Sequence, residues 1–381
     1  MTAFPEVDEL RAMARKRSGL SDFGDDDYIA GLEVLLDAYA ENPYLNDGGR
    51  RAATGVVVDA LVARLESEAW WQRDTRWQTT PVSGPLFIVG LPRTGTTALH
   101  KLIASDPTAQ SLEYWLGVHP QPRPPRETWE DNPSFIETKA ALEATYSSRP
   151  EMRAMHDMQP DEPDECRLLR MQSFVDITFD GTTYVPRYRD WLLGADQRAV
   201  YARYEKNLRL IASGDERRWV LKNPGHLLAL DVLLEQFPDA CILHTHRAPE
   251  QIIPSVCSLR ASIWRITHDN MPGEVIGRHN LDTFSAQIES ALAVREQADP
   301  SRFYDVDYRA FVADPLGTVE AIYAHFGFDL SDETRRATQQ WAEQRPQGRL
   351  GEHRYAAADF GLSDDEIRER FSTYRERFDL P

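Results

Sequence analysis

The sequence holds few cysteines, few lysines and no long apolar run. Its three cysteines, Cys166, Cys241 and Cys257, are too few and too scattered for a disulfide framework or a zinc site. No stretch approaches the roughly 18 uninterrupted apolar residues of a membrane span. The first residues carry acids where a signal peptide needs a basic and then an apolar run. These absences predict a reduced, cytoplasmic protein without a membrane span.

Positive charge is also scarce. Among 381 residues, 43 Lys and Arg stand against 61 Asp and Glu, which gives a formal net charge of −18. A basic face supplies most of the affinity for nucleic acid, so we expect no nucleic-acid partner. Only five basic residues are lysines, and the arginine- and alanine-rich composition suggests a bacterial source. A lysine in this chain is therefore an unusual choice.

The remaining composition, 41% hydrophobic and 27% charged, is that of an ordinary globular chain. Helical spacing of apolar residues predicts an N-terminal helical extension over residues 1–80. From residue 81, short apolar runs alternate with helical stretches, which predicts an α/β fold with a P-loop-type parallel sheet flanked by helices. We assign this domain to residues 81–381, with a helical lid insertion on the substrate side over about 118–215.

Local patterns predict the elements of this domain. The predicted strands are Leu86–Val89, Trp219–Leu221, Ala240–His244 and Phe303–Val306. The predicted helices cover residues 96–104, 227–237, 250–260, 280–298 and 315–326. Another helix is expected to open at Asp161–Pro163. The segment 118–135 is rich in proline and charge, which predicts a loop or lid rather than core.

A glycine-containing loop follows the first buried run. Gly90 and Gly95 have the Gly-x-x-x-x-Gly spacing of a loop whose backbone N–H groups point at a phosphate over a helix N-terminus. A tight turn that merely needs glycines is the alternative. The flanking strand and helix, with the hydroxyls of Thr96 and Thr97, favour anion binding. A nucleoside triphosphate loop carries Lys after its second glycine, whereas here the cation is Arg93, inside the loop.

The next strand argues against a magnesium-dependent phosphate site. A kinase or ATPase needs an acid at a neighbouring strand end to hold Mg²⁺. Here the strand over residues 240–244 continues as Thr245-His246-Arg247. These side chains repel a metal ion and attract a second anion, so we expect a phosphate ester that is used without a metal.

The segment Pro92-Arg93-Thr94-Gly95-Thr96-Thr97 resembles the 5′-phosphosulfate loop of sulfotransferases that use 3′-phosphoadenosine 5′-phosphosulfate (PAPS). The family loop reads Pro-(Lys/Arg)-Ser-Gly-Thr-Thr, so Thr94 is the single departure and keeps the hydroxyl. The family also carries an Arg at a strand end and a Ser eight residues later around the 3′-phosphate. Arg247 and Ser255 have that spacing.

The resemblance covers roughly residues 85–325 and is strongest to the branch that includes tyrosylprotein and bacterial sulfotransferases. It implies PAPS as the donor and a hydroxyl of a small-molecule or lipid acceptor. Tyr308, in a segment similar to the family's Tyr-Glu-x-Leu…Asp-Pro, would contact the nucleotide. Arg349 and Arg354, in a basic, glycine-containing tail, are candidates for closing the 3′-phosphate site.

Sulfuryl transfer from a phosphate to a hydroxyl needs a base, cations near the bridging oxygen and in-line placement of the two groups. Arg93 is one candidate cation. Lys222 is the other, because it follows a buried strand in a segment similar to the family's Lys-x-Pro. A lysine that only caps a helix is the alternative. Arg and Lys differ in shape and hydration, so retaining a lysine in this arginine-rich chain suggests a specific role.

Glu113 is the first candidate for the base, because it lies about where the tyrosylprotein branch places its catalytic Glu. The alternative is a structural ion pair between Glu113 and Arg93 or Arg123. His156 and His226 are rivals, since histidine is the commonest general base.

Two other functions remain open at this point: a P-loop kinase or NTPase with a rearranged lysine, and a non-catalytic nucleotide-binding module. The acceptor and the oligomeric state are open as well. Aromatic residues over 115–135, together with Trp264, would suit an apolar acceptor pocket, but core packing explains them equally well.

Overall fold

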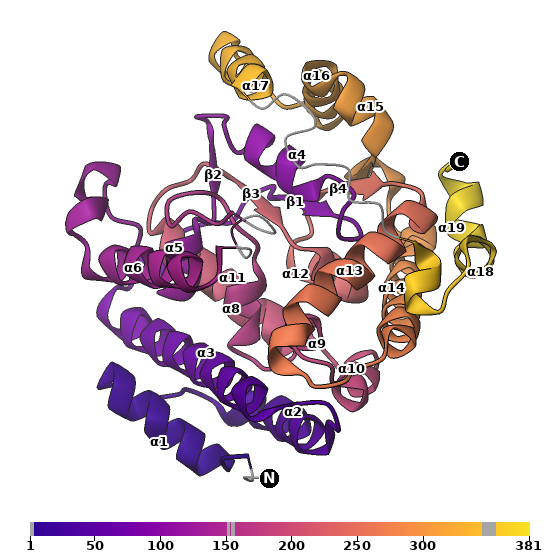
Figure 1. The fold of residues 1–381 in the computed structure, drawn as a ribbon. Helices are drawn as coiled ribbons and strands as arrows, with labels where there is room; N and C mark the ends of the chain where they lie inside the picture. Colours follow the sequence, from indigo (N-terminus) through magenta and orange to yellow (C-terminus); the bar gives the residue numbers. More distant parts are fainter. Residues whose placement is uncertain (1–3, 151–152, 154–156, 345–355) are drawn as a thin grey trace. The chain divides into compact units, whose positions relative to one another are not determined.

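The computed structural model describes residues 4–150, 153, 157–344 and 356–381. The chain divides into two compact units, each drawn from several stretches of sequence. The first unit comprises Met1–Val82, Glu113–Glu216 and Arg260–Met271, and the second comprises Ser83–Leu112, Arg217–Leu259 and Pro272–Pro381. Figure 1 labels their elements.

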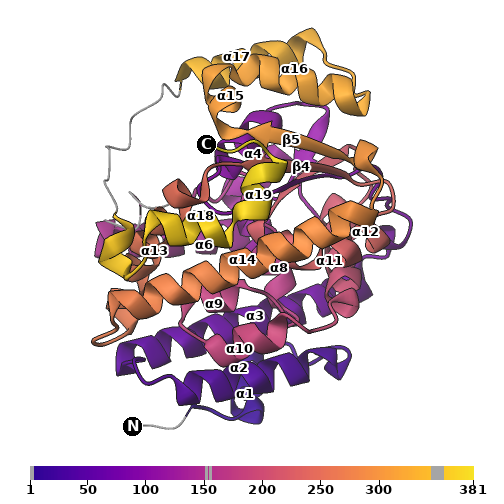
Figure 2. The same cartoon turned by 90° about the vertical axis from the view of Figure 1, so that its right-hand side faces the viewer.

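The first unit is built of helices over its described residues. They are α1 (Val7–Ser18), α2 (Ile29–Glu41), α3 (Asp47–Arg73), α5 (Tyr114–Val118), α6 (Pro133–Ser148), α8 (Arg167–Met171), α9 (Thr178–Thr182), α10 (Pro186–Leu192), α11 (Arg198–Ala212) and the end of α13 (Pro249–Thr267). The long helix α3 begins after Asn46, whose side chain accepts a hydrogen bond from the Gly49 N–H at 2.8 Å. Helix α1 packs along α3 (Figures 1 and 2).

Aromatic side chains fill part of the core of this unit. Trp115 of α5 is fully buried and meets the ring of Trp129 edge-on, with 5.3 Å between centroids. Phe135 of α6 packs against both rings. Trp264 is buried against Tyr184 in the same way. The expectation that 118–135 lies outside the core is therefore wrong at Trp129, and these aromatic residues serve core packing.

The second unit contains a five-stranded parallel sheet in the order β2-β3-β1-β4-β5. Its strands are β1 (Leu86–Val89), β2 (Ala109–Ser111), β3 (Arg218–Lys222), β4 (Cys241–His246) and β5 (Phe303–Asp307). This arrangement confirms the predicted α/β fold. In a parallel sheet the carboxyl ends of all strands lie at one edge, where α/β proteins bind their ligands.

Helices cover both faces of this sheet. Leu86 and Ile88 of the central strand point to a cluster formed with α4 (Thr96–Ile103) and α16 (Pro315–Phe326). Phe87 points the other way and packs against Phe237, which follows α12 (Leu230–Gln236). Because both faces are covered, all four residues of β1 are buried, as expected for a continuous apolar run.

The remaining helices of the second unit are α14 (Gly273–Gln297), α15 (Tyr308–Ala313), α17 (Asp332–Gln344), α18 (Asp364–Arg370), α19 (Ser372–Arg377) and most of α13. Figure 2 shows helix α18 beside α14. Two polar contacts hold them together. Arg278 of α14 pairs with Glu366 at 2.7 Å, and Arg370 donates to Ser285 of α14 at 2.9 Å.

One expectation about local structure was wrong, one predicted helix begins differently, and one strand was not predicted. No helix opens at Asp161–Pro163, because this stretch pairs with the start of α5: the Tyr114 N–H donates to the Glu162 carbonyl at 3.0 Å, and α8 begins only at Arg167. The predicted helix over 227–237 begins as a 3₁₀ turn (Pro224–Ala229). The edge strand β2 was not predicted, because three residues without an apolar run carry almost no local signal.

Within the described part of the chain, none of the helices has the length and apolar character that crossing a bilayer requires.

Candidate active site

The glycine loop connects β1 to α4 at the carboxyl edge of the sheet. Gly90 has φ +145° and Gly95 has φ +88°, conformations that residues with a Cβ rarely adopt. A Cβ on Gly95 would lie 2.9 Å from the ring of Tyr308. Helix α4 begins directly after Gly95, which as the N-cap residue makes no side-chain hydrogen bond to the first turn. The N–H groups of that turn and the positive end of the helix are therefore available to an anion.

The hydroxyl of Thr94 forms hydrogen bonds inside the loop. Its hydroxyl donates to the Leu91 carbonyl at 2.6 Å and lies 2.6 Å from the hydroxyl of Thr245 on β4. The side chain is 1% exposed. Its hydroxyl, which the sequence suggested for donor binding, is thus engaged within the protein, and Thr94 ties the loop to the neighbouring strand.

Arg247 follows β4 and lies against the same loop. Its Nη1 donates to the Arg93 carbonyl at 3.0 Å, its Nε donates to Gln251 at 3.1 Å, and its guanidinium lies 4.5 Å from the ring centroid of Tyr308. Burial, which is the largest cause, and the like charge of Arg93 lower the pKa of Arg247. A bound anion would offset both effects, since it supplies the counter-charge that this environment favours.

Lys222 reaches the loop from the other side of β1. It ends β3 opposite Ile88, its side chain is 1% exposed, and its Nζ donates to the Thr97 hydroxyl at 3.4 Å. Thr97 itself is exposed in the first turn of α4. The fold thus brings the lysine that composition singled out to the start of the anion-binding helix.

The predicted donor residues of the second unit therefore gather at one edge of the sheet. Arg93, Gly95, Lys222, Arg247 and Tyr308 all lie at the carboxyl ends of β1, β3, β4 and β5, and the contacts above join them. Thr96 is buried at the first position of α4, and Ser255 lies half-buried in the second turn of α13, after Arg247.

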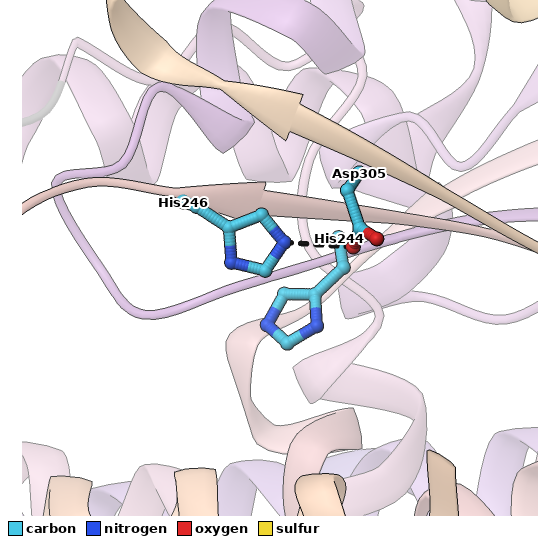
Figure 3. A group of neighbouring side chains, drawn as sticks. All are labelled: His244, His246 and Asp305. Carbon is cyan, nitrogen blue, oxygen red and sulfur yellow. Dashed lines mark hydrogen bonds and ion pairs between the residues drawn. The ribbon is translucent and has the colours of Figure 1, made fainter. Parts of the chain in front are cut away.

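A buried network behind Arg247 was not predicted from the sequence. Figure 3 shows His246 of β4 beside Asp305 of β5, with 2.8 Å between Nε2 and the carboxylate. The other ring nitrogen, Nδ1, lies 3.0 Å from the Tyr374 hydroxyl of α19, and the backbone of Arg247 hydrogen-bonds to the same hydroxyl. The Phe378 ring stacks on His246 at 3.8 Å. The C-terminal helix thus supports the strand end that carries Arg247.

The same network includes the one cluster of possible metal ligands found among the described residues: His244, His246 and Asp305, whose ligand atoms lie within 4.8 Å of one another. Arg295 donates to both oxygens of Asp305, at 2.5 and 2.8 Å, and its Nη1 lies 3.1 Å from His244. A cation would have to displace this guanidinium. We therefore assign the cluster to internal hydrogen bonding.

Glu113 belongs to the first unit and is described there on its own. It precedes α5, is 14% exposed at its side chain, and forms an ion pair with Arg123, whose Nε and Nη2 donate to it at 3.2 and 3.1 Å. Arg123 also lies 3.8 Å from Asp215. Of the two pairings considered for Glu113, the structure therefore contains the one with Arg123.

His226 is fully buried, and its ring packs edge-on against Phe87 in the core of the second unit, so it is poorly placed to meet an acceptor. His156, Arg349 and Arg354 lie outside the described residues.

Residues 85–332, more than half of the chain, match the family model described as "Sulfotransferase family". The chain belongs to the sulfotransferase family. The membership confirms the family that the loop and the Arg247–Ser255 spacing predicted, and makes the protein a sulfotransferase enzyme. The kinase and the non-catalytic module are thereby set aside.

Solved structures of bacterial relatives match this sulfotransferase along almost its whole length. Sulfotransferase STF1 from Mycobacterium tuberculosis H37Rv is 42% identical, with a TM-score of 0.91, over 98% of this chain and 100% of that one. Sulfotransferase STF9 from Mycobacterium avium is 26% identical, also with a TM-score of 0.91, over 98% of this chain and 97% of that one.

One curated relative is named for the compound that it sulfates. The omega-hydroxy-beta-dihydromenaquinone-9 sulfotransferase Stf3 of Mycobacterium bovis is 29% identical over 265 residues. The alignment covers 66% of this chain and 64% of the relative, so it spans just under two thirds of that protein's length.

Proposed function

We propose that this sulfotransferase moves the sulfuryl group of PAPS to a hydroxyl of a lipid or other small-molecule acceptor. The observation that carries the proposal is the gathering of Arg93, Lys222, Arg247 and Tyr308 around an uncapped helix N-terminus. Such a site suits a ligand with two separate phosphate groups, one over the helix and one at the arginine.

PAPS supplies an activated sulfuryl group on its 5′-phosphate and a 3′-phosphate for recognition. The N–H groups after Gly95, with Thr96 and Thr97, would hold the 5′-phosphate. Arg247 and Ser255 would hold the 3′-phosphate, and Tyr308 would pack against the nucleotide. Arg349 and Arg354 stay candidates for closing over it.

The chemical step needs positive charge where the leaving phosphate forms. Arg93 and Lys222 would stabilise the electron pair that the bridging oxygen takes when its bond to sulfur breaks. Lys222 is buried and already donates to Thr97. A preformed cation in such a site does not have to reorganise during the reaction, which favours the transition state. The reaction proposed in this way needs no metal ion.

The acceptor hydroxyl must lose its proton as the new sulfur–oxygen bond forms. We assign this proton to Glu113, following the likeness to the tyrosylprotein branch, which itself stays a prediction. Arg123 holds the carboxylate through two hydrogen bonds and so fixes its orientation. His156 is the alternative base.

A lipid alcohol is the acceptor class that we favour. Support comes from the mycobacterial relative, whose name states that it acts on a hydroxylated menaquinone. We also retain the prediction that the reaction takes place in the cytoplasm, where PAPS would be available to a reduced protein.

The test compares ligands and products on the full chain. We expect adenosine 3′,5′-bisphosphate to raise the melting temperature more than ATP with magnesium does. We also expect labelled PAPS to yield a sulfated isoprenoid alcohol in the presence of EDTA. Stronger stabilisation by ATP would overturn the donor assignment. Transfer to sugars but not to isoprenoid alcohols would overturn the acceptor class, and loss of transfer with EDTA would overturn metal independence.

A further inference from the structure

The hydrogen bonds around His246 form one continuous chain that ends at the backbone of Arg247. Nε2 of His246 lies 2.8 Å from the carboxylate of Asp305 (Figure 3), and Nδ1 lies 3.0 Å from the hydroxyl of Tyr374. The backbone of Arg247 hydrogen-bonds to the same hydroxyl. His246 is 2% exposed and Tyr374 is 1% exposed, so bulk water does not compete for these two side chains.

The direction of the chain is set at its carboxylate end. Asp305 accepts two hydrogen bonds from Arg295, at 2.5 and 2.8 Å. Burial alone would raise the pKa of Asp305, but the hydrogen bonds from His246 and Arg295 hold that pKa well below its usual range. An ionised carboxylate can only accept hydrogen bonds. Nε2 of His246 must therefore carry the proton that joins the two side chains.

The remaining directions follow from the proton on Nε2. Burial, the largest effect, lowers the pKa of His246, so the ring is neutral and its Nδ1 is an acceptor. The Tyr374 hydroxyl therefore donates its proton to Nδ1. Burial raises the pKa of Tyr374, and the backbone of Arg247 acts against this, as an N–H that donates to the oxygen does. The Tyr374 oxygen thus accepts from Arg247.

An ion pair that only joined neighbouring strands would need no such continuation. The contacts of Asp305 with Arg295 and His246 would suffice to hold β5 to α14 and β4. The chain instead runs on through Tyr374, and each of its links pairs a donor with an acceptor. It ends at the residue that we propose as the ligand of the 3′-phosphate.

We propose that Asp305 is a positioning residue for Arg247 and acts through the tautomer of His246. With its proton on Nε2, His246 takes the hydroxyl proton of Tyr374, and the Tyr374 oxygen holds the N–H of Arg247. The guanidinium of Arg247 is then presented to the donor from a fixed strand end. This inference rests on the proposed function, in which Arg247 binds the 3′-phosphate.

Asp305→Asn should reverse the tautomer. The charged guanidinium of Arg295 retains the amide oxygen, so the amide nitrogen faces Nε2 and donates to it. The histidine proton then moves to Nδ1 and points at the oxygen of Tyr374. The hydroxyl proton of Tyr374 loses its acceptor, and a buried donor without a partner is unfavourable. The hydroxyl turns, and its contact with the Arg247 backbone weakens.

The experiment measures the tautomer and the affinity separately, on the full chain. With isotope-labelled histidine, NMR correlations within the ring should place the His246 proton on Nε2 in the unaltered protein and on Nδ1 in Asp305→Asn. The signals of His246 are identified by their loss in His246→Gln. Calorimetric titration with adenosine 3′,5′-bisphosphate should show a Kd about five-fold higher in Asp305→Asn.

A double variant tests whether Asp305 acts through Tyr374. Asp305→Asn/Tyr374→Phe should bind the bisphosphate as Tyr374→Phe alone does, because both changes weaken the same contact. Asp305→Glu keeps the carboxylate, and should keep the tautomer and most of the affinity. The matched control is Asp299→Asn, the same change at an exposed position just before β5, where Asp299 accepts from Ser301 at 2.9 and 2.8 Å. It should change neither property, and urea unfolding should show that every variant is folded.

Four outcomes contradict the inference in different ways. A His246 proton on Nδ1 in the unaltered protein, or one that stays on Nε2 in Asp305→Asn, would overturn it. Equal Kd values in Asp305→Asn and Asp299→Asn would overturn it as well, and additive losses in the double variant would show that Asp305 does not act through Tyr374. If the unaltered protein did not bind the bisphosphate, the donor assignment on which the proposal rests would fail instead.

Discussion

Arg247 joins three parts of the proposed donor site: helix α13, which follows it, through Gln251, the glycine loop through the carbonyl of Arg93, and the ring of Tyr308. Its guanidinium can donate two parallel hydrogen bonds to a phosphate, which an ammonium cannot. The residue therefore combines charge with a fixed direction of approach.

Replacing Arg247 should remove the hydrogen bonds that we propose hold the 3′-phosphate. Two hydrogen bonds between charged groups stabilise a complex by roughly 3–6 kcal/mol, so we expect Arg247→Ala to weaken binding of adenosine 3′,5′-bisphosphate at least about 100-fold. Arg247→Lys should recover part of this loss. Calorimetric titration measures both, with Arg336→Ala as the control. Unchanged affinity in Arg247→Ala would show that another group holds this phosphate.

Replacing Glu113 should lower the turnover rate without changing the affinity for the donor. A positioned general base contributes about 10²–10⁴ in rate, so we expect Glu113→Gln to lower kcat by that range while the bisphosphate binds normally. Arg123→Gln tests the pair from its other side and should lower kcat less, since the carboxylate remains. If kcat is unchanged in Glu113→Gln, the ion pair is structural and the base is another group, with His156 next to be tested.

At the scale of elements, the turn from β1 into α4 depends on two glycines with positive φ. In Gly95 the left-handed backbone coincides with close approach of the Tyr308 ring. Gly214 in the first unit has a similar φ, +98°, with nothing within 4 Å of the place of a Cβ. Alanine at Gly214 therefore introduces backbone strain alone, whereas alanine at Gly95 introduces backbone strain and a steric clash with Tyr308.

We expect Gly95→Ala and Gly214→Ala each to lower the free energy of unfolding by about 1–2 kcal/mol, because both force a Cβ into a left-handed conformation. Only Gly95→Ala should also weaken binding of the bisphosphate, since the new methyl group displaces Tyr308. Urea unfolding and calorimetric titration of both variants measure the two effects. Normal donor binding by Gly95→Ala would mean that Tyr308 is not needed for the nucleotide.

The C-terminal helix α19 acts on the donor site through one hydroxyl. Tyr374→Phe removes the hydrogen bonds to His246 and to the backbone of Arg247 but keeps the ring packing. At about 1 kcal/mol for such a bond, the Kd for the bisphosphate should rise about five-fold. Tyr188→Phe loses comparable buried hydrogen bonds in the first unit and should lower stability without changing that Kd. Equal Kd values in both variants would contradict this role.

At the scale of the whole molecule, buried histidines should make the fold sensitive to acid. Burial lowers the pKa of His268 from 6.5 to about 4, and it also lowers the pKa values of His244 and His246. Unfolded, these groups take up protons near pH 6.5. The unfolded state therefore binds more protons as the pH falls towards 4, and folding loses stability over that window. His119 acts in the opposite direction, because Glu66 outweighs its burial and raises its pKa.

We therefore expect the melting temperature to fall between pH 6.5 and about 4, measured by calorimetry across that range. Above pH 6.5 the three histidines with lowered pKa add no slope, whereas His119 lowers stability as the pH rises through its raised pKa. In the folded state Nε2 of His268 lies 3.2 Å from the Asn42 amide and accepts a hydrogen bond from the Tyr184 N–H, so it has no room for a proton. His268→Gln keeps an acceptor that does not titrate, and should make the fall less steep. If the melting temperature of this variant fell with pH as steeply as that of the unaltered protein, His268 would not contribute to the loss of stability in acid.

Several features could be predicted because their causes are local. The buried strand of four apolar residues, the glycine spacing of Gly90 and Gly95, and the helix over Pro315–Phe326 each depend on neighbours in sequence, and the structure contains all three. The eight-residue step from Arg247 to Ser255 is local as well, since it crosses one strand end and two helical turns. These patterns were enough to predict the family, which the family match confirms.

What the sequence alone determined is therefore the loop, the order of the main elements and the family, because short-range patterns encode them. Only the tertiary structure decided which distant residues meet. The register of β4 and β5 sets Asp305 beside His246, Tyr374 approaches the same histidine from 128 positions away, and Glu113 pairs with Arg123. Such contacts depend on how the chain packs as a whole, so they cannot be predicted from the spacing of residues along the sequence.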